Sequence, residues 1–251
     1  MARLRAPVKG IKAVSWANEW GQPLGAPVEN WRPAGRPDGR ELRGRFCTLE
    51  RLSVERHGRD LYTANSADKD GRMWTYLPFG PFADYPDYEA WLGPASTSRD
   101  PYFYAICVPS GSGVYRAVGL CAYLRIAPEA GSIEVGALVF SPLLQRTTAA
   151  TEAMVLMMEH AFALGYRRYE WKCDALNAAS RQAALRLGFR YEGTFAQATV
   201  VKGRNRDTAW YAVTDQEWPR LKDAYGAWLD PGNFEGDGGQ RQSLSDRTAR
   251  A

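Results

Sequence analysis

The sequence predicts an α/β fold, on the basis of two observations. Residues 132–195 read in order as strand, turn, long helix, strand, short helix and strand, the alternation expected when helices connect the strands of one sheet. The chain has 251 residues, of which 45% are hydrophobic and 24% charged, so a globular protein with a substantial core is expected. We therefore expect a sheet with helices packed against it.

Each element of this fold follows from hydrophobic periodicity and from the residues that start and stop it. Alternating apolar residues predict strands at 46–52, 102–108, 115–124, 132–140 and 168–174, and a pair of strands at 189–201 and 208–213. Shorter helices are predicted at 54–66, 84–92, 177–187 and 215–229. A longer helix begins after Gln145, where small and apolar residues recur at spacings of three and four, and Gly165 ends it.

Composition divides the chain into three parts. Residues 1–45 are rich in Gly, Pro and Arg, which predicts an N-terminal extension. Residues 46–229 hold the main predicted strands and helices and form the expected domain. Residues 230–251 contain little apolar material, so we expect a mobile C-terminal tail.

Charge and composition argue against several classes of function. The formal net charge is +4, but the Lys and Arg residues are scattered, so no nucleic-acid partner is expected. No apolar run reaches the ~18 residues of a membrane span, and the N-terminus lacks a signal-peptide core, which predicts no membrane partner and a cytoplasmic location. The two His residues, and four Cys residues without CxxC spacing, predict no metal site and reduced, packed thiols.

The turn that opens the long helix is a candidate phosphate-binding site. It runs through Gln145, Arg146, Thr147, Thr148, Ala149 and Ala150. Free backbone N–H groups and the helix macrodipole favour an anion at a helix N-terminus. The two Thr hydroxyls add hydrogen-bond donors, and Arg146 adds positive charge. The alternative interpretation is an ordinary helix start with modest caps.

Three motifs give the chain a resemblance to a known family. Gln145 and Ala150 match the ends of the loop Gln/Arg-x-x-Gly-x-Gly/Ala, in which Thr148 stands in place of the middle glycine. Asn177-x-x-Ser180 is followed by ALRLGFRYEG at residues 184–193, and a third similarity is KGRNRDTAWY at residues 202–211. Over residues 45–215 the sequence therefore resembles the GNAT acetyltransferase superfamily, in particular its branch of ribosomal-protein N-acetyltransferase-like enzymes.

The resemblance implies a fold, a cosubstrate and a set of binding residues. The family fold is a mixed, strongly bent central sheet with flanking helices, and acetyl-CoA lies between two splayed central strands. The backbone of three residues would bind the pantetheine arm, namely Leu138, Val139 and Phe140. The loop of residues 145–150 would bind the pyrophosphate, and Asn177, unless it only caps a helix, would contact the cofactor arm. Ser180 would donate a proton to the leaving thiolate, the alternative being a polar surface residue at the start of a helix, and no metal is expected.

Acetyl transfer to an amine requires an unprotonated nucleophile, so a base is expected beside the thioester. Glu134 is the leading candidate, acting directly or through water, because it lies on the strand that leads into the loop. Side chains alternate along a strand, so we expect Glu134 to share a face with Gly136 and Leu138. The alternative is a carboxylate that only supports a hydrogen bond or ion pair. Tyr191 is the reserve acid, with aromatic packing as its alternative.

Aromatic residues indicate what kind of molecule accepts the acetyl group. Trp74 and Trp210 could line an acceptor pocket for a flat or cationic group, or they could pack in the core. We expect an acetyl-CoA-dependent N-acetyltransferase that acts on a primary amine of a small or aminoacyl-type molecule. The alternatives are a protein N-terminal acetyltransferase and a non-catalytic acyl-CoA-binding sensor. A homodimer is a further option.

Overall fold

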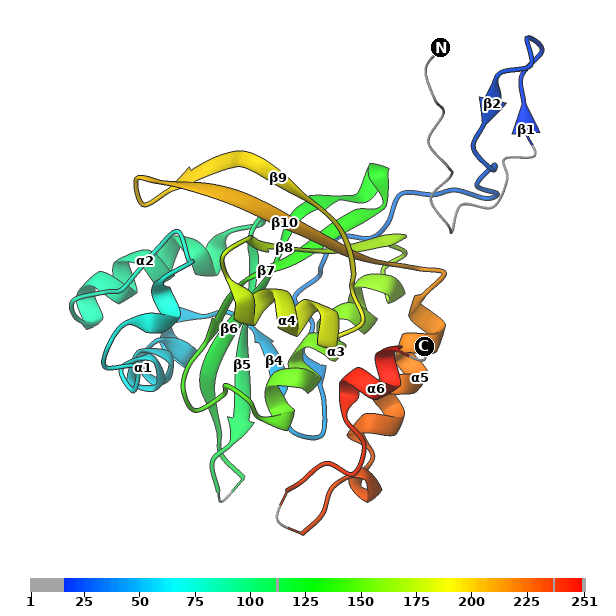
Figure 1. Ribbon diagram of the computed structural model, residues 1–251. Coiled ribbons are helices and arrows are strands. Elements are labelled where there is room, and N and C mark those ends of the chain that lie inside the picture. The colour runs from blue at the N-terminus through cyan, green and yellow to red at the C-terminus, as the bar shows by residue number, and fades with distance from the viewer. Residues whose placement is uncertain (1–15, 112, 237, 250–251) are drawn as a thin grey trace. The chain divides into compact units, whose positions relative to one another are not determined.

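The computed structural model describes residues 16–111, 113–236 and 238–249 (Figure 1). The chain divides into two compact units, residues 1–32 and residues 33–251. The predicted extension of residues 1–45 is therefore split between the units, and its first fifteen residues lie outside the described ranges. Its last part belongs to the larger unit, where the N–H of Gly35 donates to the carbonyl of Leu164 at 2.7 Å.

The smaller unit contains one short hairpin. In it, β1 (Trp16–Ala17) pairs antiparallel with β2 (Pro23–Leu24). Asn18 closes the turn, because its side-chain oxygen accepts the backbone N–H groups of Trp20 at 3.1 Å and Gln22 at 2.9 Å. An Asn side chain that replaces a backbone acceptor in this way is a common means of stabilising a tight turn.

The larger unit contains one sheet and the helices that pack on it. Its strands are β3 (Leu42–Arg43), β4 (Thr48–Arg51), β5 (Tyr102–Pro109), β6 (Tyr115–Ala127), β7 (Ser132–Phe140), β8 (Arg168–Asp174), β9 (Arg190–Val201) and β10 (Arg204–Thr214). Its helices are α1 (Val54–Asn65), α2 (Tyr85–Thr97), α3 (Thr148–Ala163), α4 (Ala178–Arg186), α5 (Trp218–Leu229) and α6 (Leu244–Ala249), with single 3₁₀ turns η1 (Arg72–Trp74), η2 (Pro128–Ala130) and η3 (Pro231–Asn233). Within the described ranges, none of these helices has the length and apolar character needed to cross a bilayer.

The eight strands form a single mixed sheet in the order β3-β4-β5-β6-β7-β8-β10-β9. All neighbouring pairs are antiparallel except β7 and β8, which run parallel and are joined through α3. The predicted α/β class and mixed sheet are confirmed, and β7 and β8 have the predicted bounds. In Figure 1, β9 and β10 form a long hairpin that extends beyond the rest of the sheet.

Helices cover both faces of the sheet, and alternation along β6 separates the two cores. Cys121 and Tyr123 join the core that contains residues of α3 and α5. Leu120 and Ala122 join the other core, which contains residues of α1 and α2. Figure 1 shows α1 and α2 together on one side of the sheet. Cys121 and the other three cysteines are buried free thiols, as predicted, and all four lie in the described residues.

A β-bulge in β7 changes which side chains face each core. Gly136 pairs with Ala122 and Val139 pairs with Leu120, so the two residues between Gly136 and Val139 oppose the single residue between their partners. Ala137 adopts a positive φ of 48° at this bulge, which moves every later side chain of the strand to the opposite face.

The bulge overturns part of the expected arrangement around Glu134. A Cβ at Gly136 would lie 3.4 Å from Glu134 Oε1, so these two residues share a face, as predicted. Leu138 instead packs against the core on the α3 side. The expectation that Leu138 shares the face of Glu134 is wrong, because it assumed uninterrupted alternation through Ala137.

A buried carboxylate connects α3 to the turn between β3 and β4. Glu152 is only 4% exposed. Its Oε1 accepts the N–H of Arg45 at 2.8 Å, and its Oε2 accepts the N–H groups of Phe46 at 2.6 Å and Cys47 at 2.9 Å. Because the carboxylate satisfies three backbone donors at once, it holds the N-terminal half of α3 against the sheet.

The C-terminal residues contain a helix that the sequence analysis did not predict. Residues 238–249 include α6, whose Leu244 is fully buried and packs with residues of α5. Thr248 of the same helix donates to the carbonyl of Arg186 at 3.1 Å. A single buried Leu and a few polar contacts produce no periodic apolar pattern in the sequence, so this helix was not predicted. Residues 237, 250 and 251 of the predicted tail lie outside the described residues.

Candidate active site

The two parallel strands part in the middle of the sheet. Pairing between β7 and β8 runs from Ser132↔Arg168 to Val135↔Trp171 and then stops, although both strands continue. Beyond Val135, the backbone of β7 therefore has no strand partner on its β8 side. This opening matches the splayed central strands that the resemblance to the GNAT superfamily implies.

A cavity of about 790 Å³ lies at this opening. It is lined by Gly136, Ala137 and Leu138 from β7 and by Lys172, Cys173 and Asp174 from β8. A cavity of this size is typical of small-molecule and cofactor sites. The opening between the strands is thus the candidate binding site.

Two contacts connect the walls of the cavity across the sheet. The loop of residues 73–79 and α2 form one wall, with Tyr76, Phe79 and Trp91 among the lining side chains. The Tyr76 hydroxyl donates to the carbonyl of Leu176 at 3.3 Å, on the α4 side. Lys202, at the turn of the β9–β10 hairpin, donates through Nζ to the carbonyl of Trp74 at 2.9 Å. The loop and the hairpin are therefore connected over this side of the sheet.

Glu134 lies in the cavity and is held by two cations. Its side chain is only about 5% exposed, and its Oε2 forms ion pairs with Arg125 and, at 3.1 Å, with Lys172 Nζ. No hydrogen bond from the described residues reaches Oε1, which lies on the side of Gly136. One oxygen is thus fixed by ion pairs, and the other faces the space that the missing side chain of Gly136 leaves.

Lys172 is a central residue of the site that the sequence analysis missed. Its Nζ is buried between Glu134 and Glu170, at 2.6 Å from Glu170 Oε2, and lies 3.7 Å from the ring centroid of Trp210. Burial tends to raise the pKa of Glu170, but hydrogen bonds from Lys172 and Arg168 outweigh it and lower this pKa. The network fixes the position of the Glu134 carboxylate.

A signal for this network was present in the sequence. In β8, the charged residues Arg168, Glu170, Lys172 and Asp174 alternate with Tyr169, Trp171 and Cys173. Such alternation predicts one polar and one apolar face. The pairing Glu134↔Glu170 then places Glu134 on the polar face, but this register is not readable from sequence alone.

The start of α4 brings Asn177 and Ser180 to the cavity wall. Asn177 caps the helix, as predicted, with its side-chain oxygen accepting the N–H of Ser180 at 3.0 Å. Ser180 Oγ accepts the indole N–H of Trp171 at 3.0 Å. Because that contact uses a lone pair of the oxygen, the Ser180 hydroxyl keeps its proton to donate, either to the neighbouring Cys173 sulfur, with which it forms a side-chain hydrogen bond, or to a ligand.

The turn before α3 is closed by its own side chains. Gln145 Nε2 donates to the carbonyl of Phe140 at 2.8 Å. The Thr147 hydroxyl caps α3 by accepting the N–H of Ala150 at 3.1 Å, and it donates to the carbonyl of Leu144 at 2.7 Å. The hydroxyl proton of Thr147 is therefore used within the protein and is not free for a ligand.

The backbone at this helix start remains open to a ligand. The N–H groups of Thr148 and Ala149 belong to the first turn of α3 and have no intrahelical acceptor. Arg146 adopts a positive φ of 62° immediately before them. None of residues 145–150 lines the cavity itself, and neither do Val139 and Phe140.

Three aromatic candidates lie outside the cavity lining. Trp74 is buried and packs edge-to-face on Phe82, with ring centroids 5.4 Å apart. Trp210 stacks on Phe195 at 4.6 Å, and its contact with the site runs through Lys172. Tyr191 is 46% exposed. The aromatic lining comes instead from Tyr76, Phe79, Trp91, Phe103 and Trp171.

Comparison with known proteins agrees with this geometry. A family model described as an acetyltransferase (GNAT) domain matches residues 48–190. The chain belongs to the GNAT acetyltransferase family. A GCN5-related N-acetyltransferase from Brucella melitensis is 46% identical, with 88% of this chain and 100% of that chain covered and a TM-score of 0.84. A probable GNAT-family acetyltransferase from Chromobacterium violaceum ATCC 12472 is 41% identical, with 78% and 97% covered and a TM-score of 0.72.

More distant GNAT structures share the fold. A RimL ribosomal L7/L12 alpha-N-protein acetyltransferase is 19% identical, with a TM-score of 0.59 over 70% of this chain and 94% of that chain. The microcin C7 self-immunity acetyltransferase MccE, solved in complex with acetyl-CoA and AMP, is 18% identical, with a TM-score of 0.59 over 68% and 93%. No curated protein matches this chain.

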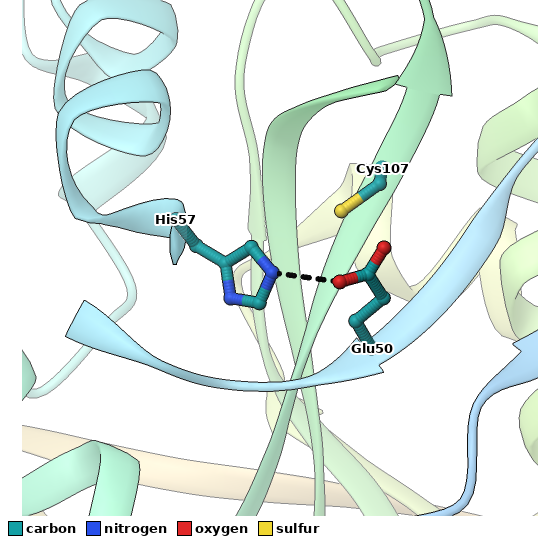
Figure 2. Close-up of side chains that lie close together, drawn as sticks. All are labelled: Glu50, His57 and Cys107. Carbon is teal, nitrogen blue, oxygen red and sulfur yellow. Dashed lines mark hydrogen bonds and ion pairs between the residues drawn. The ribbon is translucent and has the colours of Figure 1, made fainter. Parts of the chain in front are cut away.

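A second cluster of chemically active side chains lies outside the GNAT cavity lining (Figure 2). Atoms of Glu50, His57 and Cys107 that could bind a metal lie within 4.8 Å of one another. However, His57 Nδ1 accepts the N–H of Ser53 at 3.1 Å, which places the ring proton on Nε2, facing Glu50 Oε2 at 3.1 Å. Both ring nitrogens are then in use, so His57 has no lone pair left for a metal or for the Cys107 proton.

The arrangement of His57 makes stability depend on pH. Burial lowers the pKa of His57, although Glu50 acts in the opposite direction, and burial also lowers the pKa of His160. The unfolded chain therefore takes up protons below about pH 6.5 more readily than the folded chain. We expect the free energy of unfolding to fall as pH drops below 6.5, by at most ~1.4 kcal/mol per pH unit for each His.

Urea unfolding between pH 7.5 and 5 measures this dependence. In His57→Gln, where no imidazole titrates at that position, the free energy of unfolding should fall less steeply with decreasing pH than in the wild type. Equal slopes in the two proteins would show that His57 contributes nothing to the pH dependence.

Proposed function

We propose that this GNAT enzyme transfers the acetyl group of acetyl-CoA to the primary amine of a small molecule, with aminoacyl-type amines included. One observation carries the proposal: the cavity between the parting strands contains both an unpaired strand edge and a carboxylate with one open oxygen. Acetyl transfer requires a held thioester and a proton acceptor in the same place.

The protein has groups that fit acetyl-CoA, which supplies the thioester. The unpaired edge of β7 beyond Val135 offers backbone N–H and C=O groups to an extended amide-containing arm, and Leu138 of this stretch lines the cavity. The free N–H groups of Thr148 and Ala149 suit a diphosphate. Because the Thr147 hydroxyl is used within the turn, backbone donors rather than this hydroxyl would hold the phosphates.

The proposed chemistry is direct attack of the amine on the thioester. Glu134 Oε1 accepts a proton from the amine, directly or through one water molecule. The nitrogen forms a bond to the acetyl carbon, and the carbon–sulfur bond breaks. Ser180 donates its hydroxyl proton to the leaving thiolate and regains one from solvent. N–H groups on the open edge of β7 stabilise the negative charge that develops on the carbonyl oxygen.

The walls of the cavity favour a small acceptor over a protein chain. The contacts Tyr76–Leu176 and Lys202–Trp74 connect the loop, α4 and the hairpin, which limits the approach of a long polypeptide. Aromatic side chains of Phe79 and Trp91 suit the apolar part of an amine. The AMP in the MccE structure is consistent with a nucleotide-sized molecule in this fold.

The second candidate is acetylation of protein N-termini, which the fold shared with the RimL enzyme favours. Release of free thiol from acetyl-CoA, measured with a panel of small primary amines and a panel of peptides, distinguishes the two. We expect at least about tenfold higher kcat/KM with the best small amine than with any peptide. Turnover with peptides alone would favour the second candidate. Acetyl-CoA binding without transfer to any amine would indicate a sensor.

A further inference from the structure

We propose that Arg206 binds an anionic group of the acetyl acceptor, so that the substrate is an amine carrying a carboxylate or phosphate at some distance from its nitrogen. The inference depends on the proposed acetyl transfer, because it places the amine at Glu134. Arg206 lies on β10 and lines the cavity between the parting strands.

Arg206 differs from the other cations of the site because it has no counter-charge. Arg125 and Lys172 both pair with Glu134, and Lys172 also pairs with Glu170. Arg206 Nε is buried without a hydrogen-bond partner, and no carboxylate in the described residues forms an ion pair with this guanidinium. The side chain as a whole is half-buried and lines the cavity, and a guanidinium placed in this way is suited to a ligand oxygen.

Strand register places Arg206 on the face of the sheet that carries Glu134, whereas α3 packs on the opposite face. Trp210 of β10 pairs with Lys172, and Thr208 pairs with Asp174, so these side chains share the face of Glu134. Arg206 continues this alternation two residues further along β10. The predicted diphosphate site, by contrast, lies at the start of α3 and outside the cavity lining.

The same register sets the spacing between the two charged groups of the substrate. Arg206 lies four residues from Trp210, which is opposite Lys172 and hence close to Glu134. Four residues of strand span about 13 Å. The Arg206 side chain covers part of this distance. The remaining separation means that the anionic group of the substrate lies several bonds from its amine and not on the same carbon.

Asp174 is the remaining charged group at this end of the cavity. Its Oδ1 accepts the N–H of Leu176 at 2.8 Å, and it forms no ion pair with Arg206. A guanidinium binds carboxylate or phosphate oxygens in a bidentate fashion, whereas a neutral acceptor would leave its donors unpaired. The chemistry thus favours an ω-amino acid or an aminoalkyl phosphate over a simple alkylamine.

Calorimetry on the CoA-saturated protein tests this site separately from catalysis. The probes are ω-amino acids of increasing chain length with their carboxamides, and aminoalkyl phosphates with the parent amino alcohols. We expect the best anionic probe to bind on the order of 10- to 100-fold more tightly than its neutral partner. Arg206→Gln should remove that preference, and Arg206→Lys should keep part of it. Arg204→Gln, at an exposed Arg of the same strand, is the matched control and should keep the preference in full.

The outcomes separate this inference from the proposed function. A preference lost only in Arg206→Gln supports the anion site, and the ratio between carboxylate and phosphate probes identifies the anion. Equal binding of anionic and neutral probes, or weaker CoA binding in Arg206→Gln with no change for the probes, would overturn the inference. Anion-selective binding without acetyl transfer would leave the site in place and remove the proposed activity. Acetyl transfer without anion selectivity would support the proposed activity and remove the anion site.

Discussion

Glu134→Gln should lower kcat for acetyl transfer by about 10²- to 10³-fold while leaving the affinity for acetyl-CoA near the wild-type value. General base catalysis typically contributes about 10²- to 10⁴-fold. The amide has the shape of the carboxylate but cannot take a proton from the amine. Its position should be kept, because the amide oxygen can still accept hydrogen bonds from Lys172 and Arg125.

Glu170→Gln is the matched control for this prediction. Lys172 forms ion pairs with both Glu134 and Glu170, so either substitution removes one negative charge from beside this Lys. Glu170, however, does not line the cavity. We expect the control to lose less than about tenfold in kcat. Thiol release under saturating amine measures both variants. Equal losses would mean that the charge of the network matters rather than a base at Glu134, and an unchanged rate in Glu134→Gln would place the base elsewhere.

Replacing Glu152 with Ala should destabilise the fold by about 3–5 kcal/mol. The carboxylate accepts hydrogen bonds from three backbone N–H groups of residues 45–47, two of them part-buried and one buried, and its removal leaves these donors without their partner. The turn would then separate from α3. Because α3 also presents the free N–H groups of Thr148 and Ala149, cosubstrate affinity should fall together with stability.

Urea unfolding provides the measurement, with Glu159→Ala as the control on the same helix. Glu159 is 44% exposed and pairs with Lys222, so its loss should cost less than about 1 kcal/mol. If Glu152→Ala unfolds within 1 kcal/mol of the wild type, the three hydrogen bonds do not hold α3 in place.

The fold was largely predictable because its signals are local. The alternation in β7 and β8, the apolar stripe of α3, and the glycines that end α3 and α4 all act within a few residues. Gly165 and Gly188 adopt the positive φ values, 92° and 78°, that such helix ends require. The bulge at Ala137 was not predictable, because Ala at a positive φ has no sequence signature.

The site was less predictable because it depends on register between distant strands. The roles assigned to Glu134, Ser180, Asn177 and the loop of residues 145–150 stay predictions, although the structure brings the first three to one cavity. Lys172 and Arg206 were missed because strand pairing decides which charges lie beside them. That pairing joins β8 to β7 and to β10 and cannot be read from the sequence. Trp74 and Trp210 show that an aromatic residue type does not by itself distinguish pocket lining from packing.

The central claim is that the split between β7 and β8, with the start of α3, holds acetyl-CoA. Calorimetry with acetyl-CoA and with desulfo-CoA tests it directly. We expect both to bind at one site per chain, and Thr148→Glu to weaken binding by about 10- to 100-fold through repulsion of the diphosphate. An acidic residue at this first helical position favours the helix itself, so weaker binding would not reflect unfolding. Absence of binding at millimolar ligand, or full affinity in Thr148→Glu, would contradict the account.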